Sequence, residues 1–175
     1  NEGNGVYQRA ICPSKMCRQN LSIPDALKAM KSQPRLGVLL HEWFYTHLQA
    51  NPDSPGYSKV AANKLTQVLS IAVELFRLPS TVVANKEKFL FAALIADSRT
   101  VIMVFEFPTG VVSFFDSHQH GANAGAVIAQ CALSDLGEMM SWMMSMLLEM
   151  YDSKPELFEV SFLTTIPEGL PNPIK

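Results

Sequence analysis

The sequence predicts an α+β domain in which helices come first and a mostly antiparallel sheet follows. Apolar residues at helical spacing dominate the chain before Pro79, whereas short runs rich in β-branched and aromatic residues follow it. The chain has 175 residues, of which 48% are hydrophobic and 17% charged. We therefore expect a single domain, residues 1–175, with one layer of sheet and helices packed against it.

An irregular arm, residues 1–20, precedes the first expected helix. The string Ser22-Ile23-Pro24-Asp25 supplies a side-chain cap, a proline tolerated in the first turn and an acid near the positive helix end. This helix therefore begins inside the string and ends near Pro34. Two further helices are expected from about residue 35 to 49 and from about residue 59 to 76, each with its apolar residues on one face.

A change of pattern after Pro79 predicts a β-meander. Three short apolar runs, at residues 89–96, 100–107 and 111–115, are separated by tripeptides rich in turn-forming residues. The middle run is apolar on both faces, so we expect a central strand that is covered on two sides.

The last third of the chain adds a helix between strands. Residues 126–129 could form a short strand, Ser134 caps a helix that continues to about Tyr151, and residues 157–164 form the last strand before an extended tail, residues 165–175. The helix is rich in methionine and apolar on most sides, so we expect it to be buried. Its polar stripe leaves open an exposed seam for a partner, and comprises Glu138, Ser141, Ser145 and Glu149.

Composition excludes several classes of function. The net charge of −2 and the sequence pI near 6.1 leave no electrostatic footprint for nucleic acid. The most apolar stretch, residues 136–150, is too short to span a membrane and contains two glutamates. Three cysteines and the lack of an apolar leader favour an intracellular protein, cytoplasmic or nuclear. The sequence leaves the oligomeric state open.

The strongest chemical signal lies where the third apolar run ends. In Phe115-Asp116-Ser117-His118 a carboxylate and an imidazole are two residues apart, and therefore share a face of an extended backbone. Asp116 can fix the tautomer of His118, which is what a cysteine or serine hydrolase needs of its base and orienter. Because the apolar strand gives way to a polar loop here, we expect Asp116 to lie outside the deep core. A polar turn with one satisfied histidine is the alternative.

From Leu75 to Ile166 the chain resembles the ubiquitin-specific cysteine protease domain of herpesvirus large tegument proteins and their cellular and bacterial relatives. The matching features are a Leu-Pro break after a helix, two apolar strands, the Phe-Asp-x-His string followed by glycine, a late helix and a last strand. The resemblance implies a papain-like cysteine protease fold that cleaves isopeptide bonds after the ubiquitin C-terminus. It assigns the base to His118 and the orienter to Asp116, implies ubiquitin or another protein as partner, and implies no cofactor.

In this family a glutamine precedes a cysteine that opens a helix. Gln8 stands 14 residues before Ser22, so the resemblance assigns the oxyanion hole to Gln8 and the nucleophile position to Ser22. Serine departs from the family, because a papain-like site depends on a thiolate beside an imidazolium and a helix N-terminus. Ser22 is an engineered replacement of cysteine, a natural loss of the nucleophile, or a plain helix cap. A shifted alignment would make Cys17 the nucleophile.

Other polar residues carry weaker signals. A loose zinc pattern is formed by Cys12, Cys17, His118 and His120. We expect no metal there, and a buried, inert thiol at Cys131. His41 and His47 have no acidic or cysteine partner at ligand spacing, so we take both as structural.

Three functions remain open on this basis. The first is a deubiquitinase-like domain that is catalytically silent as written and binds ubiquitin or another protein. The second is an active thiol-dependent deubiquitinase, seen in a Cys-to-Ser form or using Cys17. The third is an α+β protein-interaction domain unrelated to proteases. We expect the first, because Ser22 occupies the nucleophile position.

Overall fold

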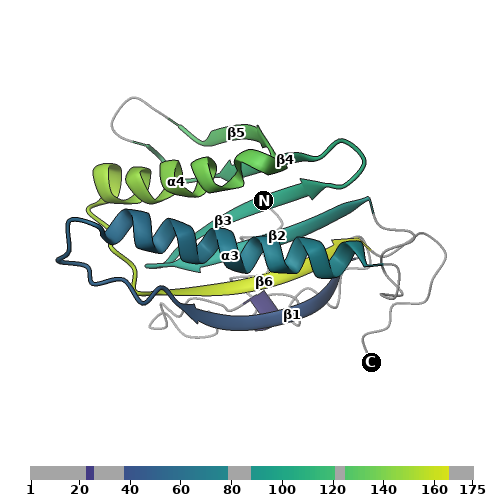
Figure 1. Ribbon diagram of the computed structural model, residues 1–175, viewed down its shortest axis with the longest axis horizontal. Helices are drawn as coiled ribbons and strands as arrows, with labels where there is room; N and C mark the ends of the chain where they lie inside the picture. Colours follow the sequence, from purple (N-terminus) through teal and green to yellow (C-terminus); the bar gives the residue numbers. More distant parts are fainter. Residues whose placement is uncertain (1–22, 26–37, 79–87, 121–124, 166–175) are drawn as a thin grey trace, which may run out of the picture.

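The structure contains one six-stranded sheet with helices on one of its faces (Figure 1). It is a computed structural model, and it describes residues 23–25, 38–78, 88–120 and 125–165. The strand order is β1-β6-β2-β3-β4-β5, and every pair of neighbours is antiparallel. The α+β class predicted from the sequence is confirmed.

Residues 23–25 form a helical turn. The remaining elements are, in chain order, β1 (Val38–His47), α3 (Tyr57–Arg77), β2 (Phe89–Ala96), β3 (Arg99–Glu106), β4 (Val111–Asp116), β5 (Val127–Ala132), the short 3₁₀ turn η1 (Leu133–Asp135), α4 (Leu136–Tyr151) and β6 (Leu157–Thr165).

The predicted helix from residue 35 to 49 is wrong where the structure describes it, because residues 38–47 form the strand β1. Trp43-Phe44-Tyr45 has high strand propensity, and these residues pair in register with β6, more than a hundred residues later in the chain. Apolar residues in this segment fit a helical stripe as well as a strand, so only the distant partner decides between the two. A strand therefore precedes α3, and the order of helices first and sheet afterwards is also wrong.

The other predicted elements that the structure describes are present within a few residues. Two of the helices, α3 and α4, lie side by side and cover the same face of the sheet (Figure 1). Strand β3 is an interior strand, as predicted, but its two faces differ. Val101, Met103 and Phe105 are buried on the helix side, whereas Ile102 and Val104 are only partly buried on the other.

The helical turn at residues 23–25 lies on the face of the sheet opposite α3 and α4. The backbone N–H of Ile23 donates to Glu159 Oε1 at 3.3 Å, and Trp43 Nε1 donates to the same oxygen at 2.8 Å. Glu159 alternates along β6 with Phe158 and Val160, which are buried in the core beneath the helices. Figure 1 shows this turn behind β6 and β1.

Within the described ranges, neither helix combines the length and the apolar character that crossing a membrane requires.

The first residue of α3 ties this helix to the segment between α4 and β6. Tyr57 is 3% exposed, and its hydroxyl donates to the carbonyl oxygen of Pro155 at 2.6 Å. Burial, and then the negative charges of Asp97 and Glu156, raises the pKa of Tyr57 to about 12. The folded state therefore holds the phenol proton to higher pH than the unfolded chain, whose tyrosine pKa is about 10.

Replacing Tyr57 with phenylalanine should lower the free energy of unfolding by about 1–2 kcal/mol, because the buried carbonyl of Pro155 loses its donor. Since the folded pKa is raised, this contribution is complete below pH 10 and declines as the pH rises toward 12. Urea unfolding at pH 8.5 and pH 11 should show the difference between the two proteins shrinking at the higher pH. A difference that is the same at both pH values would contradict this role.

Candidate active site

Strand β4 carries a carboxylate into the interior of the protein. Its helix-facing side chains include Phe114 and Asp116, which are 0% and 1% exposed, whereas Phe115 between them is 40% exposed on the other face. The expectation that Asp116 lies outside the deep core is therefore wrong. Because side chains alternate strictly along β4, Asp116 lies on the same face of the sheet as Phe114, under the end of α4.

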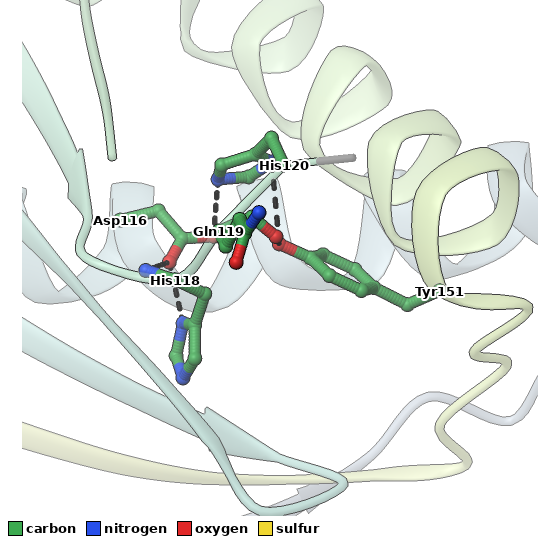
Figure 2. Close-up of polar contacts among 5 residues, drawn as sticks. All are labelled: Asp116, His118, Gln119, His120 and Tyr151. Atoms are coloured by element: carbon green, nitrogen blue, oxygen red, sulfur yellow. Dashed lines mark hydrogen bonds and ion pairs between the residues drawn. The ribbon is translucent and has the colours of Figure 1, made fainter. Parts of the chain in front are cut away.

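One oxygen of Asp116 holds His118 by two contacts. The His118 backbone N–H donates to Asp116 Oδ1 at 2.9 Å, and the ring Nδ1 lies 2.5 Å from the same oxygen (Figure 2). A carboxylate accepts hydrogen bonds and cannot donate them, so Nδ1 carries the proton. The lone pair of a neutral ring is then on Nε2, which has no partner in the described part of the chain. The His118 side chain is 32% exposed.

The other oxygen of Asp116 faces a second histidine. His120 Nε2 lies 3.3 Å from Asp116 Oδ2, and both atoms are buried. The angles at this contact do not meet those of a hydrogen bond, so the attraction is electrostatic. The Tyr151 hydroxyl lies 3.3 Å from His120 Nδ1 and 3.1 Å from the carbonyl oxygen of Gln119. The carbonyl oxygen can only accept, so the single phenol proton of Tyr151 goes to Gln119, and the Tyr151 oxygen is left to accept from His120 Nδ1.

Tyr151 connects the end of α4 to this group of side chains (Figure 2). Burial, and then the charge of Asp116, raises the pKa of Tyr151, and the opposing effect of Arg99 is smaller. The Arg99 guanidinium lies over the Tyr151 ring, 4.0 Å from its centre. Tyr151 thus remains a neutral hydroxyl, and its oxygen lies against His120 Nδ1. Sequence reasoning named neither residue as part of this site: His120 appeared only as a zinc ligand, and no spacing links Tyr151 to Asp116.

The structure brings two of the predicted site residues together, Asp116 and His118. The other predicted site residues lie outside the described part of the chain; they are Gln8, Cys12, Cys17 and Ser22. Two of the four residues of the zinc pattern, Cys12 and Cys17, are thus not described, and among the described residues no group of three or more potential ligands is placed to hold a metal.

Ile23, the described neighbour of Ser22, can be placed relative to the Asp116–His118 dyad. Ile23 contacts Glu159, which pairs with Ile95 at the end of β2, and this end of the sheet also holds the end of β4. Three strand spacings separate β6 from β4, or about 14 Å. Ile23 and Asp116 therefore lie at the same end of the sheet, on opposite faces.

The remaining histidines and the described cysteine show no sign of catalysis. His41 Nε2 lies 2.7 Å from Thr164 Oγ1 and its ring meets the edge of Phe76, while burial lowers its pKa despite the charge of Glu42. His47 is exposed. Burial raises the pKa of the half-buried Cys131 thiol, which is therefore a poor nucleophile.

No protein-family model matches this chain, and no curated protein matches it.

The tautomer of His118 provides a direct test of the dyad. We expect long-range ¹H–¹⁵N spectra at pH 8 to show His118 protonated at Nδ1, because Asp116 accepts that proton. The exposed His47, whose ring makes no hydrogen bond within the described residues, is the control in the same spectrum and should show a mixture of the two tautomers. Finding His118 protonated mainly at Nε2 would contradict the dyad.

Proposed function

We propose that this chain is a papain-like, deubiquitinase-like domain that keeps its base and orienter, lacks a thiol at the nucleophile position, and binds ubiquitin or another protein. The observation that supports this proposal best is the 2.5 Å contact between His118 Nδ1 and Asp116 Oδ1 on a half-exposed ring. It directs the free Nε2 lone pair away from the carboxylate, as a general base requires.

The dyad could serve isopeptide hydrolysis in the following way. His118 Nε2 would take the proton of a thiol, and the thiolate would attack the carbonyl carbon of the Gly–Lys bond. His118 would then return the proton to the departing lysine amine, leaving a thioester that water hydrolyses. A backbone or Gln8 donor would stabilise the oxyanion. The hydroxyl of Ser22 has a far higher pKa than a thiol, so the first step would be lost and binding would remain.

An active thiol-dependent deubiquitinase is the second candidate, and one specific observation favours it. Asp116 is held at both oxygens, and the support extends through His120 to Tyr151 at the end of α4. This arrangement orients His118 as an active enzyme would need. Only the nucleophile separates the two candidates, and either a cysteine at position 22 or Cys17 would supply it.

We expect Ser22→Cys to react with ubiquitin that carries a C-terminal electrophile, because a helix N-terminus and a nearby imidazole activate a thiol. Since Ile23 lies on the face of the sheet opposite Asp116, labelling at position 22 would also show that this residue reaches His118 around the end of the sheet. The protein with Ser22 should bind ubiquitin without reacting. Intact-mass spectrometry distinguishes the covalent adduct of the variant from the unmodified Ser22 protein. Modification of Cys17 in the protein as written would instead support the second candidate. If neither protein binds or reacts with ubiquitin, the third possibility, an unrelated interaction domain, replaces both.

In the Ser22→Cys protein, Asp116→Asn should slow labelling at least about 100-fold, because His118 loses its orienter. Since Asp116 is buried and accepts from His118, a loss of about 1–3 kcal/mol in the free energy of unfolding should accompany it. Asp53→Asn, in the exposed loop that precedes α3, is the matched control and should label normally. Equal labelling rates for the two variants at a temperature where both are folded would remove Asp116 from the mechanism.

A further inference from the structure

Within the described residues, strand β5 forms an edge of the sheet whose own sequence lacks the usual protection against pairing. In the described part of the chain β5 pairs with β4 alone (Figure 1). Its sequence, VIAQCA, contains neither a charged residue nor a proline, although exposed edges usually carry one of these. On the face opposite α4, Ile128 is 69% exposed and pairs with Phe115, which is 40% exposed. This edge is therefore suited to pairing with another extended segment.

The other face of β5 borders a groove beneath α4. Two hollows, of about 550 and 440 Å³, share Trp142 and are lined by residues of both β5 and α4. The ring of Trp142 packs edge-on against the buried Phe114 and is held in place, yet the residue stays 41% exposed. From β5 the groove is lined by the half-buried Val127, Ala129 and Cys131. The first hollow ends at His120, beside the Asp116 network.

The groove is negatively charged. Its charged lining residues in the described structure are Asp135, Glu138 and Glu149, and neither lysine nor arginine is among the lining residues. The Cys131 thiol responds to the same charges, because Asp135 and Glu138 add to the effect of burial on its pKa. Two of these acids belong to the polar stripe of α4 that the sequence left open as a seam for a partner.

We propose that this groove binds an extended peptide segment that adds a strand to β5 and alternates apolar with basic residues. Backbone pairing along the free edge of β5 would supply affinity. Alternate side chains of an added strand point to opposite faces of the sheet. One set would cover Ile128, and the other would face Glu138 and Glu149. Ile128, Glu138 and Glu149 are all exposed, so both sets of peptide side chains can reach their contacts.

The dimensions of the two elements agree with one another. Eleven residue steps from Glu138 to Glu149 extend about 16 Å along the helix. The six residues of β5 cover about the same length, since an extended chain advances about 3.4 Å per residue. A peptide along β5 can therefore place its basic residues opposite both glutamates.

A second copy of this chain fits the groove less well than a basic segment. Pairing β5 with β5 would bring the three carboxylates of one groove close to those of the other, and like charges oppose such an approach. The test of this site is independent of the nucleophile question, because it changes neither Ser22 nor Cys17.

The probe for this site is a fluorescent eight-residue peptide, Lys-Val repeated four times, tested by anisotropy against the full chain. It should bind at 50 mM salt and more weakly at 300 mM, whereas Glu-Val repeated four times should not. A Lys-Val peptide with N-methyl groups on alternate residues of its pairing edge should also fail, because it cannot pair with β5. Hydrogen exchange at Val127–Ala132 should slow when the Lys-Val peptide is present.

The double variant Glu138→Gln/Glu149→Gln should weaken binding about 3–10-fold, as expected for two exposed ion pairs. Glu74→Gln, at an exposed position of α3, is the matched control and should bind the peptide as the parent protein does. Equal binding of the double variant, or of the peptide whose N-methyl groups block pairing, would overturn the proposal. So would a stable dimer in sedimentation whose formation protects β5, because the occupant would then be a second copy.

Discussion

The buried carboxylate of Asp116 is the constraint on which the geometry of the site depends. Removing a charge from water is costly unless donors replace the lost hydration. At Oδ1 the donors are the backbone and ring of His118, whereas Oδ2 accepts no hydrogen bond within the described residues and has only the electrostatic contact with the His120 ring. The chain leaving β4 must therefore turn back over its own last residue. The loop conformation that exposes His118 follows from the need to satisfy Asp116.

This constraint reaches beyond the loop, because α4 takes part in it. The helix packs its methionine-rich face against the core, and its last residue, Tyr151, then reaches His120. The same helix presents Glu138 and Glu149 to the groove beside β5. One rigid element thus positions the dyad at its end and the acidic groove along its side. His120 lines the groove and also contacts the carboxylate of Asp116. A peptide that shifted α4 would therefore also shift His120.

Much of this arrangement is predictable because it is local in sequence. The stripe of α3, the turns between β2, β3 and β4, and the Asp-x-His spacing each depend on residues close together in the chain. Strand β1 is different, because its partner β6 lies at the other end of the chain. The apolar spacing around Trp43-Phe44-Tyr45 fits the period of a helix and that of a strand equally well, so only the partner strand decides between them. Local pattern therefore favoured a helix, and long-range pairing overrode it.

The burial of Asp116 could not be predicted for a related reason. A carboxylate at the end of an apolar strand belongs at the surface unless donors converge on it, and one of the groups that arranges them, Tyr151, arrives 35 residues later. The Asp-x-His spacing predicted that Asp116 pairs with His118 alone. The structure shows that Asp116 contacts two imidazoles, those of His118 and His120, which have different surroundings. His118 is partly open to solvent, and His120 is enclosed by α4. Because one carboxylate holds both rings, the enclosed histidine restrains the acid, and the restrained acid orients the open histidine. The fixed orientation of the open His118 ring and the restraint of the enclosed His120 are then two consequences of the same buried charge.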